Sequence, residues 1–63
     1  MTPDLRDVET IIRRECAMAR MFEEPRRFIV DGVIFEVGNR SDWHHVFREY
    51  KDKRAIRARQ VMP

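Results

Sequence analysis

The sequence predicts an α+β fold in which two helices pack on one antiparallel β-hairpin, in the order α-β-β-α. Three observations predict it. Apolar residues recur at helical spacing through the first 22 residues, Asp31-Gly32 separates two alternating strands, and Ser41-Asp42 opens a second helical pattern. We expect residues 1–50 to form the helix–hairpin–helix domain and residues 51–63 to be a basic C-terminal extension.

The first helix is predicted to begin at Thr2-Pro3-Asp4 and to end near Phe22. Thr2 suits a helix cap, Pro3 the first helical position, and Asp4 complements the helix dipole. Glu23-Glu24-Pro25 disfavours continuation, because the residue before a proline avoids the helical region. The apolar stripe of this helix consists of Leu5, Val8, Ile12, Cys16 and Ala19.

Residues 27–30 and 33–37 are predicted to form a hairpin around Asp31-Gly32, because a two-residue Asp-Gly loop between such runs is a strong hairpin signal. This loop predicts the pairs Val30/Val33, Ile29/Ile34, Phe28/Phe35 and Arg27/Glu36. Since side chains alternate, one face carries Phe28, Val30, Val33, Phe35 and Val37. A lone hairpin is unstable in water, so this face must pack on the helices.

The second helix is predicted to follow the turn at residues 38–40, with Ser41 as its cap and Asp42 in its first turn. Its apolar stripe consists of Trp43, Val46, Phe47 and Tyr50, which Ile56 could prolong. Beyond Tyr50 the sequence has little to bury. We therefore expect residues 51–63 to fray in the free chain and to become ordered on assembly.

The length of 63 residues allows one domain of marginal stability. Cys16 is the single cysteine, so it is a small buried hydrophobe or pairs with another chain, and no internal disulfide exists. No apolar run approaches the roughly 18 residues that cross a bilayer, and the acidic N-terminus is unlike a signal peptide. We expect a soluble, intracellular protein that binds no membrane.

Charge is unevenly distributed along the chain. Residues 1–50 carry eight basic and ten acidic side chains, whereas residues 51–63 carry five basic and one acidic. The segment could contact phosphates, order against an acidic protein surface, or stay solvated. The candidate partner or DNA contacts are Lys51, Lys53, Arg54, Arg57 and Arg59.

The sequence lacks the patterns expected of an active site. Ser41 has no nucleophile elbow around it, and Cys16 lies on an apolar helical stripe, where a thiol is inert. His44 and His45 are adjacent on a helix and point about 100° apart, so they do not converge on one metal ion. We therefore expect no enzyme activity, no metal and no cofactor.

The second hairpin face suggests self-association. If both helices cover the aromatic face, Ile29 and Ile34 are left exposed, beside the Arg27–Glu36 pair. An exposed hairpin edge adds to this tendency. These four residues are therefore the candidate subunit interface.

The order of elements resembles the small head–tail joining protein W family of lambda-like tailed phages. The matching stretch runs from Arg26 to Glu36, followed by Ser41-Asp42-Trp43 at the start of the second helix, and the resemblance covers roughly residues 3–55. It implies a virion structural protein, made in the host cytoplasm, that forms a homo-oligomeric ring below the portal. Such a ring retains the packaged double-stranded DNA, which lies nearby as a non-specific partner, and it offers a platform to tail-side connector proteins.

Two other functions remain in competition with the connector. The first is a small DNA-binding or regulatory protein that grips the duplex backbone with its basic segment, although the strands between the helices do not fit a helix-turn-helix. The second is an inhibitor or adaptor of a host protein.

Overall fold

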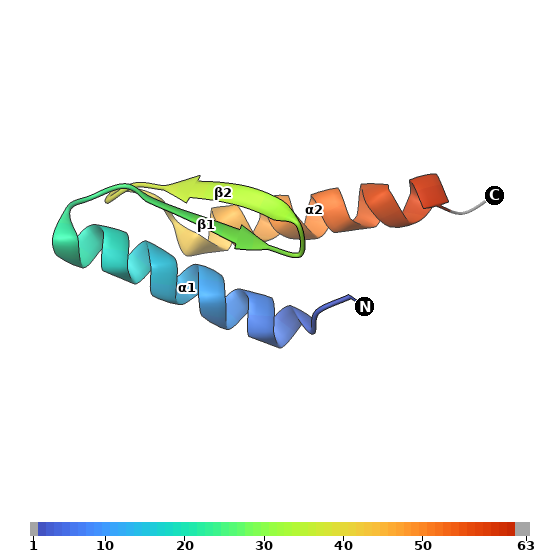
Figure 1. Cartoon of the computed structure of the whole chain (residues 1–63), viewed down its shortest axis with the longest axis horizontal. Coiled ribbons are helices and arrows are strands. Elements are labelled where there is room, and N and C mark those ends of the chain that lie inside the picture. The colour runs from blue at the N-terminus through green and yellow to red at the C-terminus, as the bar shows by residue number, and fades with distance from the viewer. Residues whose placement is uncertain (1, 62–63) are drawn as a thin grey trace.

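The computed structural model describes residues 2–61 and confirms the predicted α+β class. The elements are α1 (Leu5–Phe22), β1 (Arg26–Val30), β2 (Val33–Val37) and α2 (Trp43–Val61), as Figure 1 shows. The two strands form one antiparallel hairpin. Of the predicted basic extension, residues 62–63 lie outside the described residues.

Helix α1 begins two residues later than its proline suggests. The prediction that Thr2 caps the helix is wrong: Asp4 is the cap, and its side chain accepts a hydrogen bond from the Arg6 amide at 2.7 Å. A carboxylate accepts the hydrogen bond of this amide, and its negative charge interacts favourably with the positive end of the helix dipole, so it is a strong cap. The predicted end at Phe22 is confirmed, and Glu23 terminates the helix in the left-handed conformation.

The hairpin has the predicted register. All four predicted pairs are present, and Arg26 adds a fifth pair with Val37. Asp31 and Gly32 have φ values of 53° and 74°, as a type I′ turn requires. Asp31 tolerates this conformation better than most residues, which explains why an Asp-Gly pair turns the chain here.

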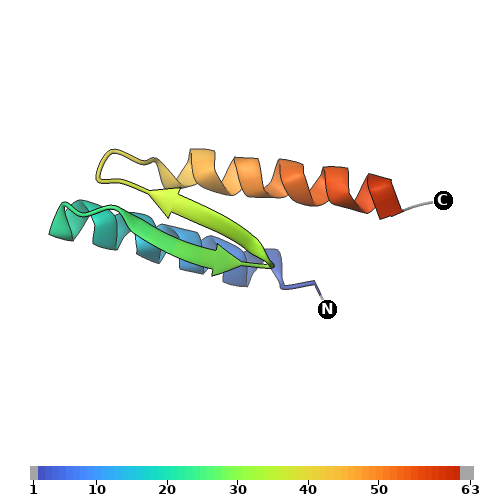
Figure 2. The same ribbon diagram turned by 45° about the horizontal axis from the view of Figure 1, so that its top comes forward.

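Both helices lie on one side of the hairpin, and α1 and α2 run antiparallel beneath it (Figures 1 and 2). The predicted aromatic face points inward, where the Phe35 ring is 5.4 Å from Phe28 and 6.2 Å from Tyr50 between centroids. The buried core consists of Val8, Ile12, Cys16, Ala19, Val30, Phe35, Val37 and Tyr50.

An ion pair ties α1 to the start of β1. Glu15 is almost fully buried on α1, and its carboxylate lies 2.8 Å from the Arg26 guanidinium. Arg20, at the end of α1, donates to the Ser41 carbonyl at 3.4 Å. These contacts hold the first helix against the hairpin and against the segment that leads into α2.

Helix α2 is capped by Asp42, and the prediction that Ser41 is the cap is wrong. The Asp42 carboxylate accepts from the His44 amide at 3.0 Å, and the Asp42 carbonyl accepts from Val46. The Ser41 hydroxyl instead accepts from the Gly38 amide at 2.9 Å. Ser41 therefore closes the preceding turn, and the residue after it starts the helix.

Helix α2 continues without a break to Val61, and its last turns project past the hairpin turn (Figures 1 and 2). The described chain is consequently elongated, with extents of 45 × 17 × 16 Å. Ile56 is half exposed, so the buried stripe ends at Tyr50. Fraying of residues 51–63 in the free chain stays a prediction. Within residues 2–61, neither helix is long and apolar enough to span a membrane.

Candidate functional site

The outer face of the hairpin carries the four predicted interface residues. Ile29 and Ile34 face each other across the strands and are 69% and 64% exposed. Beside them the exposed side chains of Arg27 and Glu36 approach to 3.7 Å. An apolar pair next to a pair of opposite charges therefore occupies the side of the sheet that no helix covers. We call these four residues the outer hairpin face.

The same four residues present backbone groups at the sheet edges. In a two-residue hairpin the pair next to the turn, Val30 and Val33, exchanges ladder hydrogen bonds. The next pair, Ile29 and Ile34, therefore directs its amides and carbonyls outward, as does Arg27 with Glu36. Within residues 2–61, no other hydrogen bond uses these outward groups. Both edges are thus open to another strand.

Two side chains of α2 contact the hairpin turn, and a third contacts one of them. The Tyr50 hydroxyl donates to the Asp31 carboxylate at 3.1 Å, and Arg57 donates to the Asp31 carbonyl at 3.2 Å and also to its carboxylate. Arg54 lies 3.5 Å from the Tyr50 oxygen. We call Asp31, Tyr50 and Arg57 the turn clasp. It joins the tip of the hairpin to the middle of α2.

The charges of the turn clasp shift the pKa values of its members. The hydrogen bond from Arg57 is the main cause that lowers the pKa of Asp31, and Tyr50 adds to it. Burial raises the pKa of the Tyr50 phenol, and the hydrogen bond to the Asp31 carboxylate raises it further. Asp31 is therefore ionised and Tyr50 neutral near neutral pH.

The clasp divides the basic residues predicted to contact a partner. Arg54 and Arg57 contact Tyr50 and Asp31, although the Arg57 side chain stays 47% exposed. Lys51, Lys53 and Arg59 are exposed, and the Lys51 ammonium lies 4.7 Å from the centroid of the Phe47 ring. Arg59 lies on the side of α2 opposite Tyr50, because nine residues at about 100° each make half a turn more than two full turns. The basic segment therefore has one side that faces the fold and another that faces solvent.

Sequence reasoning missed the clasp, although one signal points to it. Tyr50, Arg54 and Arg57 have the i, i+4, i+7 spacing of one helical face. Their partner Asp31 was interpreted only as a turn residue, and nothing in the sequence pattern relates its carboxylate to a helix that begins after the hairpin.

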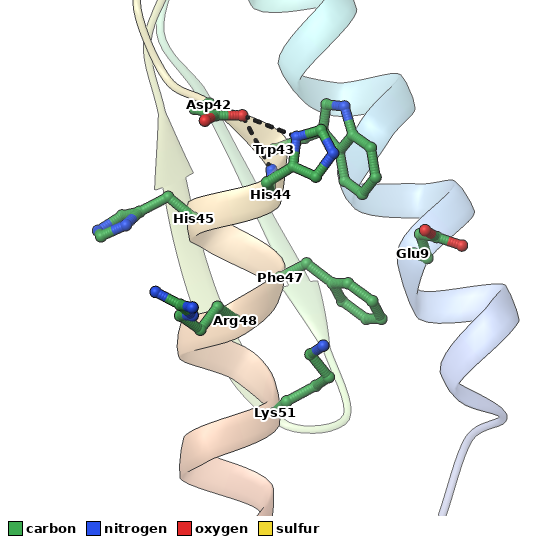
Figure 3. Close-up of a pocket in the computed structure, with 8 residues that line it drawn as sticks. All are labelled: Glu9, Asp42, Trp43, His44, His45, Phe47, Arg48 and Lys51. Atoms are coloured by element: carbon green, nitrogen blue, oxygen red, sulfur yellow. Dashed lines mark hydrogen bonds and ion pairs between the residues drawn. The ribbon is translucent and has the colours of Figure 1, made fainter.

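A groove opens where α2 begins beside α1 (Figure 3). Trp43 and Phe47 point toward α1, while His45 and Arg48 point away from it. Its volume is about 490 Å³, and it is lined by Glu9, Asp42, Trp43, His44, His45, Phe47, Arg48 and Lys51. It is open and mixed in polarity, and several of its side chains contact one another.

Asp42, Trp43 and His44 of this groove contact one another or their neighbours. The Asp42 carboxylate accepts from the His44 amide, which is the main cause that lowers the pKa of Asp42. The His44 ring stacks on Trp43 at 3.7 Å between centroids, and the Arg13 guanidinium carbon lies 4.6 Å from the centroid of the Trp43 ring. These contacts therefore stabilise the first turn of α2, beside which the groove lies.

Other candidate groups are inaccessible or dispersed. Cys16 is buried, and its burial raises the pKa of the thiol, which weakens it as a nucleophile. Among the residues that the structure describes, no three side chains of the metal-binding types gather around one point. The absence of enzyme activity stays a prediction.

No family model, no curated protein and no solved structure matches this chain. The outer hairpin face and the basic side of α2 are the two surfaces that bear on function.

Proposed function

We propose that this chain is a structural head–tail connector protein of a tailed bacteriophage. Copies of it form a ring below the portal, which retains the packaged DNA and provides the platform for tail attachment. The observation that carries this proposal is the outer hairpin face, where Ile29 and Ile34 remain exposed on an otherwise folded domain. Its identity as a virion joint comes from the resemblance of residues 3–55 to the protein W family.

Self-association supplies burial that a lone copy lacks. A chain of this size buries only about 60% of the surface of its unfolded state. Each copy leaves two facing isoleucines and two strand edges unused, and two neighbours of the same kind, one at each edge, would use both edges and bring isoleucines of adjacent copies together. Repetition around an axis then yields a closed assembly of identical contacts.

The projecting end of α2 supplies a second surface for a connector. Lys51, Lys53 and Arg59 are exposed on a helix that extends past the hairpin. In a ring these cations repeat with the symmetry of the assembly. They face an acidic surface of the portal or of a tail-side connector, or duplex DNA beside the ring.

Those exposed cations also favour a second candidate function, a small DNA-binding protein. Cations that neutralise phosphates give an affinity that falls with salt, with a slope of about −0.9 per contact. A filter-binding titration of the free chain on random duplex DNA separates the two functions. Tight, salt-sensitive binding by the monomer supports the DNA-binding protein, and weak binding supports the connector.

The connector function is tested with DNA-filled, tailless heads that lack their joining protein. Purified chain is mixed with heads at two salt concentrations. Binding is measured by co-sedimentation with the heads, and tail attachment is measured by infectivity after tails are added. We expect the chain to co-sediment with heads and to restore tail attachment. Failure to do either would make the connector proposal wrong.

Matched variants connect this test to the outer hairpin face. Ile29→Thr with Ile34→Thr should abolish ring formation and tail attachment, because threonine keeps the β-branched shape while removing apolar surface. Ile56→Thr changes an isoleucine of α2 that is also half exposed and should leave both unchanged. Equal loss in the two variants would contradict a role specific to the hairpin.

A further inference from the structure

We propose that neighbouring copies join edge to edge, with β1 of one copy pairing antiparallel with β2 of the next. In this arrangement Ile29 lies opposite Ile34 of the next copy, and Arg27 lies opposite Glu36 of the next copy. The inference rests on the self-association in the proposed function and names its geometry. The occupant of each open strand edge is therefore a second copy of this chain.

The outward backbone groups match across such a contact. Arg27 and Ile29 direct amides and carbonyls from the β1 edge, and Ile34 and Glu36 do so from the β2 edge. Antiparallel pairing of these edges satisfies both sets and extends the sheet without a break. The strands are five residues long, so the two outward positions on each strand make up nearly the whole edge.

Side-chain chemistry selects one register of this pairing. With Ile29 opposite Ile34 of the next copy, the apolar residues are neighbours, and Arg27 lies opposite Glu36. A row of isoleucines and a row of alternating charges then run across the contact between the two copies. A shift of two residues places an isoleucine opposite a charge. A shift of one residue would turn the next copy over, so that its aromatic face lies on the same side of the joined sheet as Ile29 of the first copy and its core is exposed.

The same chemistry disfavours pairing of like edges. Two β1 edges bring Arg27 and Ile29 against Arg27 and Ile29, and two β2 edges bring together two copies of Glu36. Neither arrangement offers a carboxylate to a guanidinium. The pairing of unlike edges is therefore favoured, and an unlike pairing is head to tail, as a ring requires.

The shape of the domain makes this contact curve. Two strands span about 10 Å, because neighbouring strands lie about 4.8 Å apart. The described chain is 17 by 16 Å across, since two helices lie beneath those strands. Copies joined through their narrow hairpin layer must fan apart at the helix layer. The helices thus lie on the convex side, and a head-to-tail contact that turns in one direction closes into a ring.

Disulfide trapping tests this geometry in the full chain. Two single variants, Ile29→Cys and Ile34→Cys, are made with Cys16→Ala, given different mass tags, mixed in equal amounts and oxidised mildly. Opposed residues that exchange backbone hydrogen bonds have Cα atoms about 5.5 Å apart, which suits a disulfide. We expect the 29–34 heterodimer to exceed the proportion that random collision gives. Ile56→Cys mixed with Ile34→Cys is the matched control and should give only that random proportion.

Homodimers of either variant in excess, or products in random proportion, would overturn the edge pairing. A charge exchange provides a second measurement, because it does not depend on cysteine chemistry. Arg27→Glu and Glu36→Arg should each weaken association several-fold in sedimentation, and the two changes in one chain should restore it. If the double variant unfolds at the wild-type temperature but does not regain association, the proposal is also overturned.

The outcomes separate this inference from the proposed function. If wild-type chain forms rings and joins heads but 29–34 links do not exceed random proportion, the edge geometry is wrong and the connector stands. If 29–34 links form and heads are not joined, the contact is right and the connector is wrong. If the chain neither associates nor joins heads, both are wrong.

Discussion

The Asp31 carboxylate in the hairpin turn is hydrogen-bonded by Arg57, which lies 26 residues further along the chain. The Tyr50 hydroxyl shares the same carboxylate. The contact links the tip of the hairpin to a helical segment whose sequence offers little to bury. It explains how α2 is held beyond the last buried residue of its apolar stripe.

Asp31→Asn should lower stability in a pH-dependent way. Because Arg57 lowers the pKa of Asp31 in the folded state, the unfolded state binds a proton more readily, and ionised Asp31 stabilises the fold above its ordinary pKa of 3.8. This contribution is lost as the pH falls through the lower, folded pKa. Thermal unfolding from about pH 7 to pH 2 should show wild type and variant converging at the acid end.

Asparagine suits this position as a test because it also tolerates a left-handed backbone, so the turn itself is retained. Asp52→Asn, on an exposed position of α2, is the matched control and should follow wild type. A gap between Asp31→Asn and wild type that is constant over the whole pH range would contradict the role of the charge.

Tyr50 contributes both a buried ring and a hydroxyl, and two substitutions separate them. Tyr50→Phe removes the hydrogen bond to Asp31 and should cost about 1 kcal/mol of unfolding free energy. Tyr50→Ala also removes a side chain that is 1% exposed and should cost about 3–5 kcal/mol, enough to unfold a domain of this size. Urea unfolding measures both, and similar losses would show that the ring packs loosely.

Arg26→Met should leave Glu15 as a nearly buried carboxylate without its guanidinium. We expect a loss of about 1–3 kcal/mol at neutral pH, since an unpaired buried polar group loses its hydration. Adding Glu15→Leu should recover most of the loss, because an apolar pair replaces the ion pair. A double-mutant cycle by urea unfolding measures the coupling, and additive losses would mean that the pair contributes nothing.

Gly32→Ala should destabilise the turn by about 1 kcal/mol. The cost is conformational, because Gly32 has a φ of +74° and an added Cβ meets no atom within 4 Å. Gly38→Ala is the natural control: its Cβ also meets nothing, and its backbone has no left-handed φ. Equal melting temperatures for the two variants would contradict the need for a left-handed residue in the turn.

Arg57→Gln and Arg59→Gln should differ although both remove a charge from α2. Arg57→Gln should speed amide hydrogen exchange over residues 51–60, because the clasp that holds this segment is lost. Arg59→Gln should leave exchange unchanged and reduce the salt slope of DNA binding by about 1. Equal exchange in the two variants would show that the helix end is ordered without the clasp.

Much of the fold was predictable because its signals are local. The Asp-Gly loop predicts the hairpin, its register and both of its faces, and the structure confirms each of them. The helix caps were harder to assign. Thr2 and Asp4, like Ser41 and Asp42, are all residue types that cap helices, and the choice depends on which side chain reaches the free amide.

The candidate site was predictable only in part. Ile29, Ile34, Arg27 and Glu36 share a face by strand alternation alone, so their grouping follows from the sequence. The five basic residues after Tyr50 look equivalent in sequence. Their surroundings differ only because α2 packs beside the hairpin turn, where Arg57 donates hydrogen bonds to Asp31.

The sequence by itself thus determined the elements, the hairpin register and the face that is left uncovered, because periodicity and turn chemistry act between near neighbours. Only the tertiary structure decided which basic residues contact the hairpin turn, that the Asp31 carboxylate accepts from Arg57, and where along its length α2 is held. Those outcomes depend on contacts between distant segments, and their distances are set by how the helices pack on the sheet.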